Sequence, residues 1–151
     1  MKELNGSELA GFIKERQAKA VRGLRQQWKI EPKLAIIQTK DDPVINTYVR
    51  LKKQYGADIL VDVDVYRIDQ KNAAEVIEKL NSDDTVHGII VQLPLANIEE
   101  TDQILNLVAP NKDVDALGTS SDFDPATPMA IMWLLAGFDV GLNGKKIVLV
   151  G

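Results

Sequence analysis

The sequence predicts an α/β fold in three layers, with a mostly parallel sheet between two layers of helices. Two observations carry this prediction. Short apolar runs at 34–39 and 88–93 have the composition of strands that are buried on both faces. Segments with helical periodicity separate the strands, and such an order implies right-handed crossovers and parallel strands.

Residues 7–28 are expected to form a long amphipathic helix. Apolar side chains recur there at the spacing of one helical face, and Arg and Lys occupy the opposite side. Pro32 separates this helix from the first strand at 34–39. The N-terminal part of the chain is therefore predicted to be one helix followed by a buried strand.

A second helix is predicted over 43–55. Asp42 supplies an acidic N-cap, Pro43 suits the first turn, and Gly56 is a stop signal. Alternating Val and Asp then indicate a strand over 59–68, with its first half at a sheet edge.

The remaining elements follow the same alternation. Residues 72–80 have the pattern of an amphipathic helix, and 88–93 form the next buried strand before Pro94. Further helices are expected at 99–108 and 128–136, and a last short strand at 145–150.

The composition limits the function. With 151 residues, 45% hydrophobic and 26% charged, the chain suits one ordinary globular domain. Its 18 basic and 22 acidic side chains give a formal charge of −4, which argues against nucleic-acid or membrane partners. No cysteine and a single histidine argue against a metal centre. No long apolar segment is present, so we expect a cytoplasmic protein.

Lys52 is the most informative side chain. At about 100° per residue, it lies at the centre of the apolar arc of helix 43–55, on the same face as Tyr48. An ammonium group against apolar surface loses hydration, which disfavours its charged form and suits a lysine to proton transfer. The pattern equally allows Lys52 to lie at an edge with its amine in water, and Tyr48 to be a core aromatic.

Gln92 interrupts an apolar strand near its C-terminal end, where open α/β sheets place ligand crevices. A buried amide needs a partner, either a lysine amine, a ligand or the backbone of a neighbouring loop. Asp113 and Asp115 follow in a loop, where aspartate is also common as a turn or cap residue. His87 is expected at a loop or strand edge, without a triad partner.

Four strings, taken in order, resemble the bifunctional methylenetetrahydrofolate dehydrogenase/cyclohydrolase family over essentially the whole chain. Tyr48-Val-Arg-Leu-Lys52 matches the family pattern Tyr-Val-x-x-Lys, and residues 88–95 match Gly-Ile-x-Val-Gln-Leu-Pro-Leu. Residues 110–115 match Pro-x-Lys-Asp-Val-Asp, and Pro125-Ala-Thr-Pro128 is similar to Pro-Cys-Thr-Pro. The Gln-Leu-Pro-Leu and Lys-Asp-Val-Asp strings are specific, so a chance match to all four is improbable.

The resemblance implies a role for each matching residue. Lys52 would transfer the proton, with Gln92 holding and tuning its amine. Tyr48 would stack on the folate, and Asp115 would bind the polar edge of the pterin ring. The implied catalytic residues are Lys52, Gln92 and Asp115, and the implied substrate-binding residues are Tyr48, Leu93, Pro94 and Asp113.

The family's activity would be the oxidation of 5,10-methylenetetrahydrofolate with NAD(P), followed by hydrolysis of the methenyl product to 10-formyltetrahydrofolate. NADP is the expected cofactor, with NAD as the alternative, and a tetrahydrofolate derivative is the expected substrate. The resemblance also implies one-carbon metabolism that serves purine biosynthesis, and a homodimer.

The resemblance divides the chain into a folate-binding catalytic domain at 1–140 and the start of an NAD(P)-binding domain at 141–151. Gly151 would be the first glycine of a cofactor loop. The rest of this Rossmann-type domain is absent from the sequence, so these residues alone are not expected to catalyse hydride transfer. Three positions depart from the family: Ile45 replaces a serine, Gln54 a lysine and Ala116 a glycine.

Two other functions compete with the bifunctional enzyme. The departures at Ile45 and Ala116 are compatible with a degenerate folate-binding module without catalysis. A flavodoxin-like or receiver-like regulatory domain also alternates strands and helices. It would need an acidic cluster or a phosphate loop after the first strand, and 39–41 supplies neither. The regulatory domain therefore ranks last.

Overall fold

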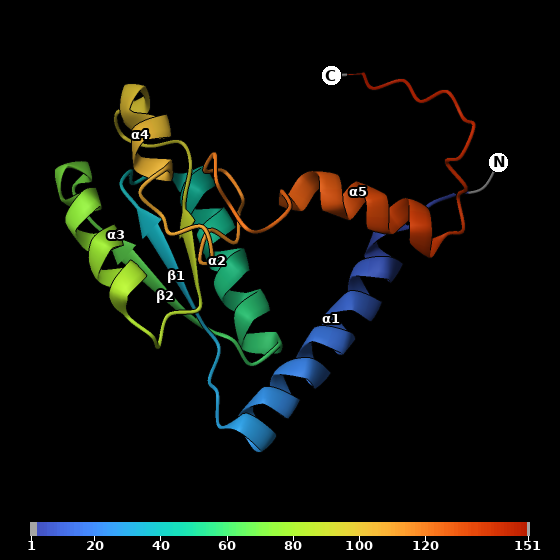
Figure 1. Cartoon of the computed structure of the whole chain (residues 1–151), viewed down its shortest axis with the longest axis horizontal. Coiled ribbons are helices and arrows are strands. Elements are labelled where there is room, and N and C mark those ends of the chain that lie inside the picture. Colours follow the sequence, from blue (N-terminus) through green and yellow to red (C-terminus); the bar gives the residue numbers. More distant parts are fainter. Residues whose placement is uncertain (1–2, 151) are drawn as a thin grey trace.

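The computed structural model describes residues 3–150 and has an α/β architecture (Figure 1). A π-helical turn, Leu24–Trp28, extends the first helix, and short 3-10 turns lie at Gln70–Asn72 and Ile98–Glu100. The main elements are α1 (Gly6–Gly23), β1 (Lys33–Gln38), α2 (Pro43–Asp58), β2 (Asp62–Arg67), α3 (Ala73–Ser82), β3 (Gly88–Val91), α4 (Thr101–Leu105) and α5 (Ala126–Gly137).

The sheet has three parallel strands in the order β2-β1-β3. The central strand is fully buried from Ala35 to Gln38, because it has a neighbour on each side and helices on both faces. β2 is an edge strand, and its alternating exposed and half-buried residues match the predicted edge pattern. The predicted parallel sheet is therefore confirmed.

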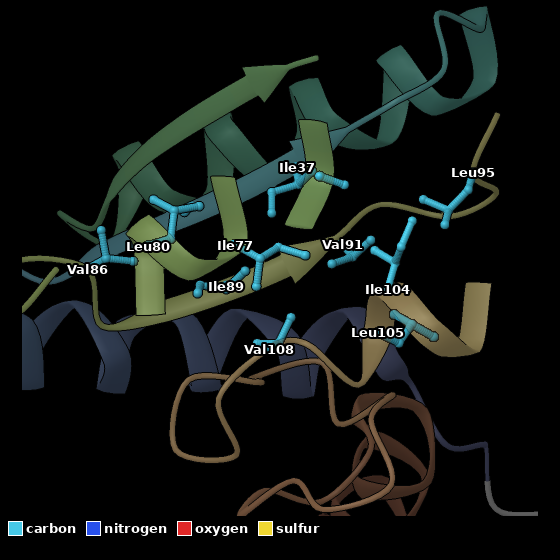
Figure 2. Packing of buried hydrophobic residues seen from close by; sticks show 12 residues of the cluster. Ile37, Ile77, Leu80, Val86, Ile89, Val91, Leu95, Ile104, Leu105 and Val108 are labelled. Atoms are coloured by element: carbon cyan, nitrogen blue, oxygen red, sulfur yellow. The ribbon is translucent and has the colours of Figure 1, made fainter. Parts of the chain in front are cut away.

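Two hydrophobic clusters form the layers above and below the sheet. On one face, α2 places Ile45 and Val49 against Ile36 and Ile90. On the other face, α3 and α4 cover the sheet with a larger cluster, which Figure 2 shows. The three-layer prediction is confirmed. The labelled members of the larger cluster are Ile37, Ile77, Leu80, Val86, Ile89, Val91, Leu95, Ile104, Leu105 and Val108.

α1 and α5 form an outer pair that stands away from the sheet (Figure 1). α1 is attached to α2 by an ion pair between Lys14 and Asp58 at 2.5 Å, and by the Tyr55 hydroxyl, which donates to Gln17 Oε1 at 2.6 Å. α5 has no fully buried residue within the described chain. No helix among the described residues has both the length and the apolar character that a membrane crossing requires.

Three predicted elements need correction. The strand predicted at 145–150 is wrong: these residues form no strand, because no neighbouring strand pairs with them, and Leu149 is 90% exposed. The helix predicted at 99–108 is shorter, consisting of one 3-10 turn and α4. β2 begins at Asp62 rather than at 59, since α2 continues to Asp58 and residues 59–61 form the connection.

Candidate active site

Lys52 and Gln92 meet directly. The Lys52 ammonium donates a hydrogen bond to Gln92 Oε1 at 2.8 Å in a partly buried position. α2 is placed for this contact by its N-terminus, where the Asp42 carboxylate accepts the backbone N–H of Val44 at 2.9 Å, as the capping pattern predicted. Val49, which is 1% exposed, packs toward the sheet and orients the helix. The predicted pairing of amine and amide is confirmed.

Gln92 lies one residue beyond β3, at the carboxyl end of the sheet. Its backbone N–H donates to Ile37 O at 2.8 Å, and its side-chain Nε2 donates to Leu93 O at 2.9 Å. Of the three alternatives for the partner of this amide, two are present together, a loop backbone at Nε2 and a lysine at Oε1. Because Nε2 is held by a carbonyl, Oε1 is the atom left to receive Lys52.

Among the described residues, the Lys52 amine has a neutral hydrogen-bonding partner and no ion pair. Within residues 3–150, no carboxylate forms a salt bridge with Lys52. An ammonium group carries three donors, and the contact with Gln92 uses one of them. The remaining capacity is available to a substrate or to water, which is what a general acid or base requires.

A pocket of about 360 Å³ lies between α2 and β2, and Lys52 is among its lining residues whereas Gln92 is not. Tyr48, Lys52 and Tyr55 contribute to its wall, and the rest is apolar. Tyr48 is 56% exposed, so its interpretation as a core aromatic is wrong. A large exposed ring beside a pocket is suited to stacking on a flat ligand.

The periodicity predicted that Lys52 lies at the centre of a buried helical face. The structure places it elsewhere. Ile45 is 3% exposed, whereas Val44 and Leu51 on the other flank of the arc are 63% and 51% exposed. Lys52 lies on the border between them and is half-buried. The sheet covers half of the apolar arc, and the other half faces the pocket and solvent.

The two aspartates have different surroundings. Asp113 is 5% exposed, and its carboxylate accepts the backbone N–H of Gly118 at 2.9 Å, so it holds its own loop. Asp115 is half-buried and makes no hydrogen bond or ion pair within the described chain. Of the two, Asp115 has the carboxylate that is free for a ligand. The next residue, Ala116, has a φ of 52° where the family has glycine.

Of the other predicted residues that the structure describes, only Leu93 contacts the pair, through its backbone carbonyl, which accepts from Gln92 Nε2. Leu93 packs against the larger hydrophobic cluster, and Pro94 follows a cis peptide bond and is exposed. His87 lies just before β3, where its Nδ1 accepts the Lys33 backbone N–H at 3.2 Å, as its interpretation as a loop or edge residue predicted. Gly151 lies outside the described residues.

Sequence reasoning missed Tyr55, Gln38 and Asn46. Tyr55 could have been found, because it lies seven residues after Tyr48 on the same helical face. Gln38 carries the same signal as Gln92, an amide near the C-terminal end of an apolar strand, but its hydrogen bond to Asn46, which joins β1 to α2, has no signature in the sequence. It depends on how the connection between these elements runs.

The described chain offers no metal or dinucleotide site. No group of three or more His, Cys, Asp or Glu residues among 3–150 could hold a metal ion. Dinucleotide phosphates bind where a glycine-rich turn joins a strand to a helix N-terminus. Around Gly141 and Gly144 the described chain has neither the strand nor the helix, so these residues do not fit a nicotinamide cofactor.

The fold and the site define a class: an α/β catalytic domain with a lysine–glutamine pair at the carboxyl end of its parallel sheet. A family model described as "tetrahydrofolate dehydrogenase/cyclohydrolase, catalytic domain" matches residues 4–115. The chain belongs to this family, as the four strings predicted.

Curated relatives agree with the family. The bifunctional protein FolD of Acetivibrio thermocellus is 36% identical over 163 residues, which cover 99% of this chain and 57% of the relative. The FolD protein of Streptococcus pyogenes serotype M5 is 34% identical, and the alignment covers 98% of this chain and 57% of the relative. The chain therefore spans a little over half the length of these relatives.

Solved structures show the same fold. The bifunctional FolD enzyme of Campylobacter jejuni superposes with a TM-score of 0.89 at 34% identity, covering 94% of this chain and 55% of that one. The Trypanosoma brucei methylenetetrahydrofolate dehydrogenase-cyclohydrolase was solved with NADP and an inhibitor. It superposes with a TM-score of 0.84 at 26% identity, covering 93% of this chain and 53% of that one.

Proposed function

We propose that the complete protein interconverts one-carbon folates, and that Lys52 and Gln92 carry its cyclohydrolase step. The observation that carries the proposal is the 2.8 Å hydrogen bond to Gln92 from Lys52, whose side chain lines the same pocket as Tyr48. The family match and the names of the relatives support the choice of folate as substrate. Domain 1–140 would bind the folate.

In the hydration step, water attacks the methenyl carbon of 5,10-methenyltetrahydrofolate. Its oxygen forms the new bond to carbon, and the neutral amine of Lys52 accepts the proton that is released. The hydroxyl group of this adduct then loses its proton as its oxygen becomes the formyl C=O and the bond from carbon to N5 breaks. N5 takes up one proton in exchange, the proton on Lys52 passes to solvent, and 10-formyltetrahydrofolate results. Gln92 Oε1 accepts an N–H of Lys52 whether the amine is neutral or charged, so it holds the base throughout.

Substrate orientation is assigned to two further side chains. The exposed Tyr48 ring would stack on the flat part of the folate, and the free Asp115 carboxylate would accept N–H groups from the polar edge of the pterin. Leu93, Pro94 and Asp113 would act indirectly, through the shape of the loops that end the sheet.

The dehydrogenase step needs NADP, with NAD as the alternative, and no described residue is assigned to either. We propose it for the complete protein because the relatives are called bifunctional and the Trypanosoma brucei enzyme was solved with NADP. Residues 141–151 would begin the cofactor-binding domain. A homodimer, a cytoplasmic location and a contribution to purine biosynthesis belong to the same proposal.

The test is Lys52→Met in the complete gene product, with Lys53→Met as the matched control. Lys53 is the neighbouring lysine but is exposed. Because general acid–base catalysis contributes about 10² to 10⁴ in rate, Lys52→Met should lower cyclohydrolase kcat by at least about 100-fold. Lys53→Met should leave the rate unchanged.

Loss of methenyltetrahydrofolate absorbance measures the rate. Equal rates for Lys52→Met and the unsubstituted protein would refute the assignment of the base. Tight binding of a folate analogue without any turnover by the unsubstituted protein would instead favour a degenerate binding module.

A further inference from the structure

A second buried amide lies beside the candidate active site. Gln38 is the last residue of β1 and is 2% exposed, at the end of an otherwise apolar strand. Ile37 pairs with Val91 in the parallel register, so Gln38 and Gln92 occupy the next positions on neighbouring strands. Side chains alternate along a strand, which places Gln38 on the same face as Ile36, toward α2.

The Gln38 side chain joins the sheet to α2. Its Nε2 donates to Asn46 Oδ1 at 2.7 Å and to Lys40 O at 2.8 Å, and Asn46 Nδ2 donates to an Asp41 carboxylate oxygen at 2.8 Å. A carbonyl and a carboxylate can accept but not donate. The direction of both amides is therefore determined by their surroundings.

Stability alone does not account for an amide at position 38. Its Oε1 atom is buried and has no hydrogen-bond partner among the described residues. A buried acceptor without a partner destabilises a protein, and an apolar side chain of similar size would avoid that cost. The two acceptors of Nε2 depend less on Gln38, because Lys40 is exposed and Asn46 is half-buried, so that water can reach them.

Both ends of the catalytic pair depend on the end of β1. Gln92 receives its position from Ile37 O, through its backbone N–H at 2.8 Å. Lys52 lies six residues after Asn46 on α2, so the bond from Gln38 to Asn46 sets where this helix sits along the same strand. We propose that Gln38 is a positioning residue that keeps the Lys52 amine within reach of Gln92. The inference rests on the proposed function.

The experiment compares Gln38→Leu with Thr47→Ala in the complete gene product. Thr47→Ala is the control, since it removes a hydrogen bond of 2.9 Å to Pro43 O in the same part of α2 without touching Gln38 or Asn46. For each variant we would measure cyclohydrolase kcat and KM, the pH profile of kcat, unfolding by urea, and the side-chain amide resonance of Gln92.

Small misplacements of a catalytic group are costly, so Gln38→Leu should lower kcat about tenfold with KM nearly unchanged. It should also shift the limb of the pH profile that depends on Lys52 and move the Gln92 resonance, while the urea midpoint stays the same or rises. Thr47→Ala should change none of the catalytic quantities.

The possible failures are distinguishable. A wild-type kcat and pH profile for Gln38→Leu would overturn the positioning role, as would a fall in kcat that accompanies a loss of stability with an unchanged pH profile. Failure of the proposed function itself would be seen earlier, as an inactive unsubstituted protein or an active Lys52→Met variant.

Discussion

At the scale of single residues, the choice of an amide beside Lys52 is chemically informative. A carboxylate at position 92 would form a charge-assisted bond that stabilises the ammonium form. The carbonyl oxygen of Gln92 holds the amine at 2.8 Å without adding a charge. Lys52 is therefore held in place by a partner that carries no charge.

Ala116 offers a prediction about stability. Its φ of 52° lies in the left-handed region, where a Cβ atom costs about 1–2 kcal/mol and glycine has no such cost. Substitution by glycine removes this cost, but the greater freedom of the unfolded chain offsets about 0.5–1 kcal/mol of the benefit. Ala116→Gly should therefore raise the free energy of unfolding by up to about 1 kcal/mol, measured by urea titration.

The control at the same position is Ala116→Val, because a β-branched side chain is poorly tolerated at positive φ. It should destabilise the protein by about 1 kcal/mol or more. If Ala116→Gly instead lowered the free energy of unfolding by about 1 kcal/mol relative to the unsubstituted protein, Ala116 would not have the left-handed conformation.

Lys52 and Gln92 could be predicted from the sequence because a polar side chain in an apolar segment is visible without a structure. The role of Asp113 could not be predicted from the sequence. Its carboxylate bonds to the N–H of Gly118, five residues later, and that contact exists only once the loop has turned back on itself. The bond from Gln38 to Asn46 was hidden for the same reason.

At the scale of elements, α1 depends on polar contacts with α2. The hydrogen bond from Lys14, followed by that from Gln54, lowers the pKa of the Asp58 carboxyl below its ordinary value of 3.8. A group with a lowered folded pKa contributes stability above its unfolded pKa, and this contribution disappears as the pH falls through the folded pKa. The Lys14–Asp58 contact should therefore weaken on acidification below about pH 4.

Lys14→Met tests this dependence. The variant should lose less stability than the unsubstituted protein between pH 5 and pH 3, measured as the change in urea midpoint. Glu75 and Asp83 also have lowered pKa values, but they titrate in both proteins and cancel in the comparison. Lys53→Met, at an exposed lysine, should behave like the unsubstituted protein. An identical acid response for Lys14→Met would show that Asp58 does not couple to α1.

Elements were predictable where local pattern and tertiary packing agree. α2 starts at Pro43, as its capping signals predicted, and β1 was found because an apolar run needs no partner to be recognised. The strand predicted at 145–150 has the same apolar character, but a strand requires a neighbour for its hydrogen bonds. Periodicity also could not show that α4 ends at Leu105.

At the scale of the whole molecule, burial is uneven. The sheet contains completely buried side chains such as Ile36 and Ile37, whereas Trp133 and Met132 of α5 are 46% and 52% exposed. Apolar hollows of about 560 and 630 Å³ lie along the contact between α1 and α5. Helices that bury little apolar surface are expected to open more easily than the sheet.

Amide hydrogen exchange on the 151-residue chain tests this difference between α5 and β1. Opening of α5 exposes little new apolar surface, so its amides should exchange at least about tenfold faster than those of β1, equivalent to about 1.4 kcal/mol. α3 is the matched control, because it is a helix of similar length that buries Ile77 and Leu80 completely or nearly so. The amides of α3 should exchange as slowly as those of β1, because both require global unfolding. Equal protection of α5 and α3 would mean that the contact with α1 stabilises α5 as strongly as the sheet stabilises α3.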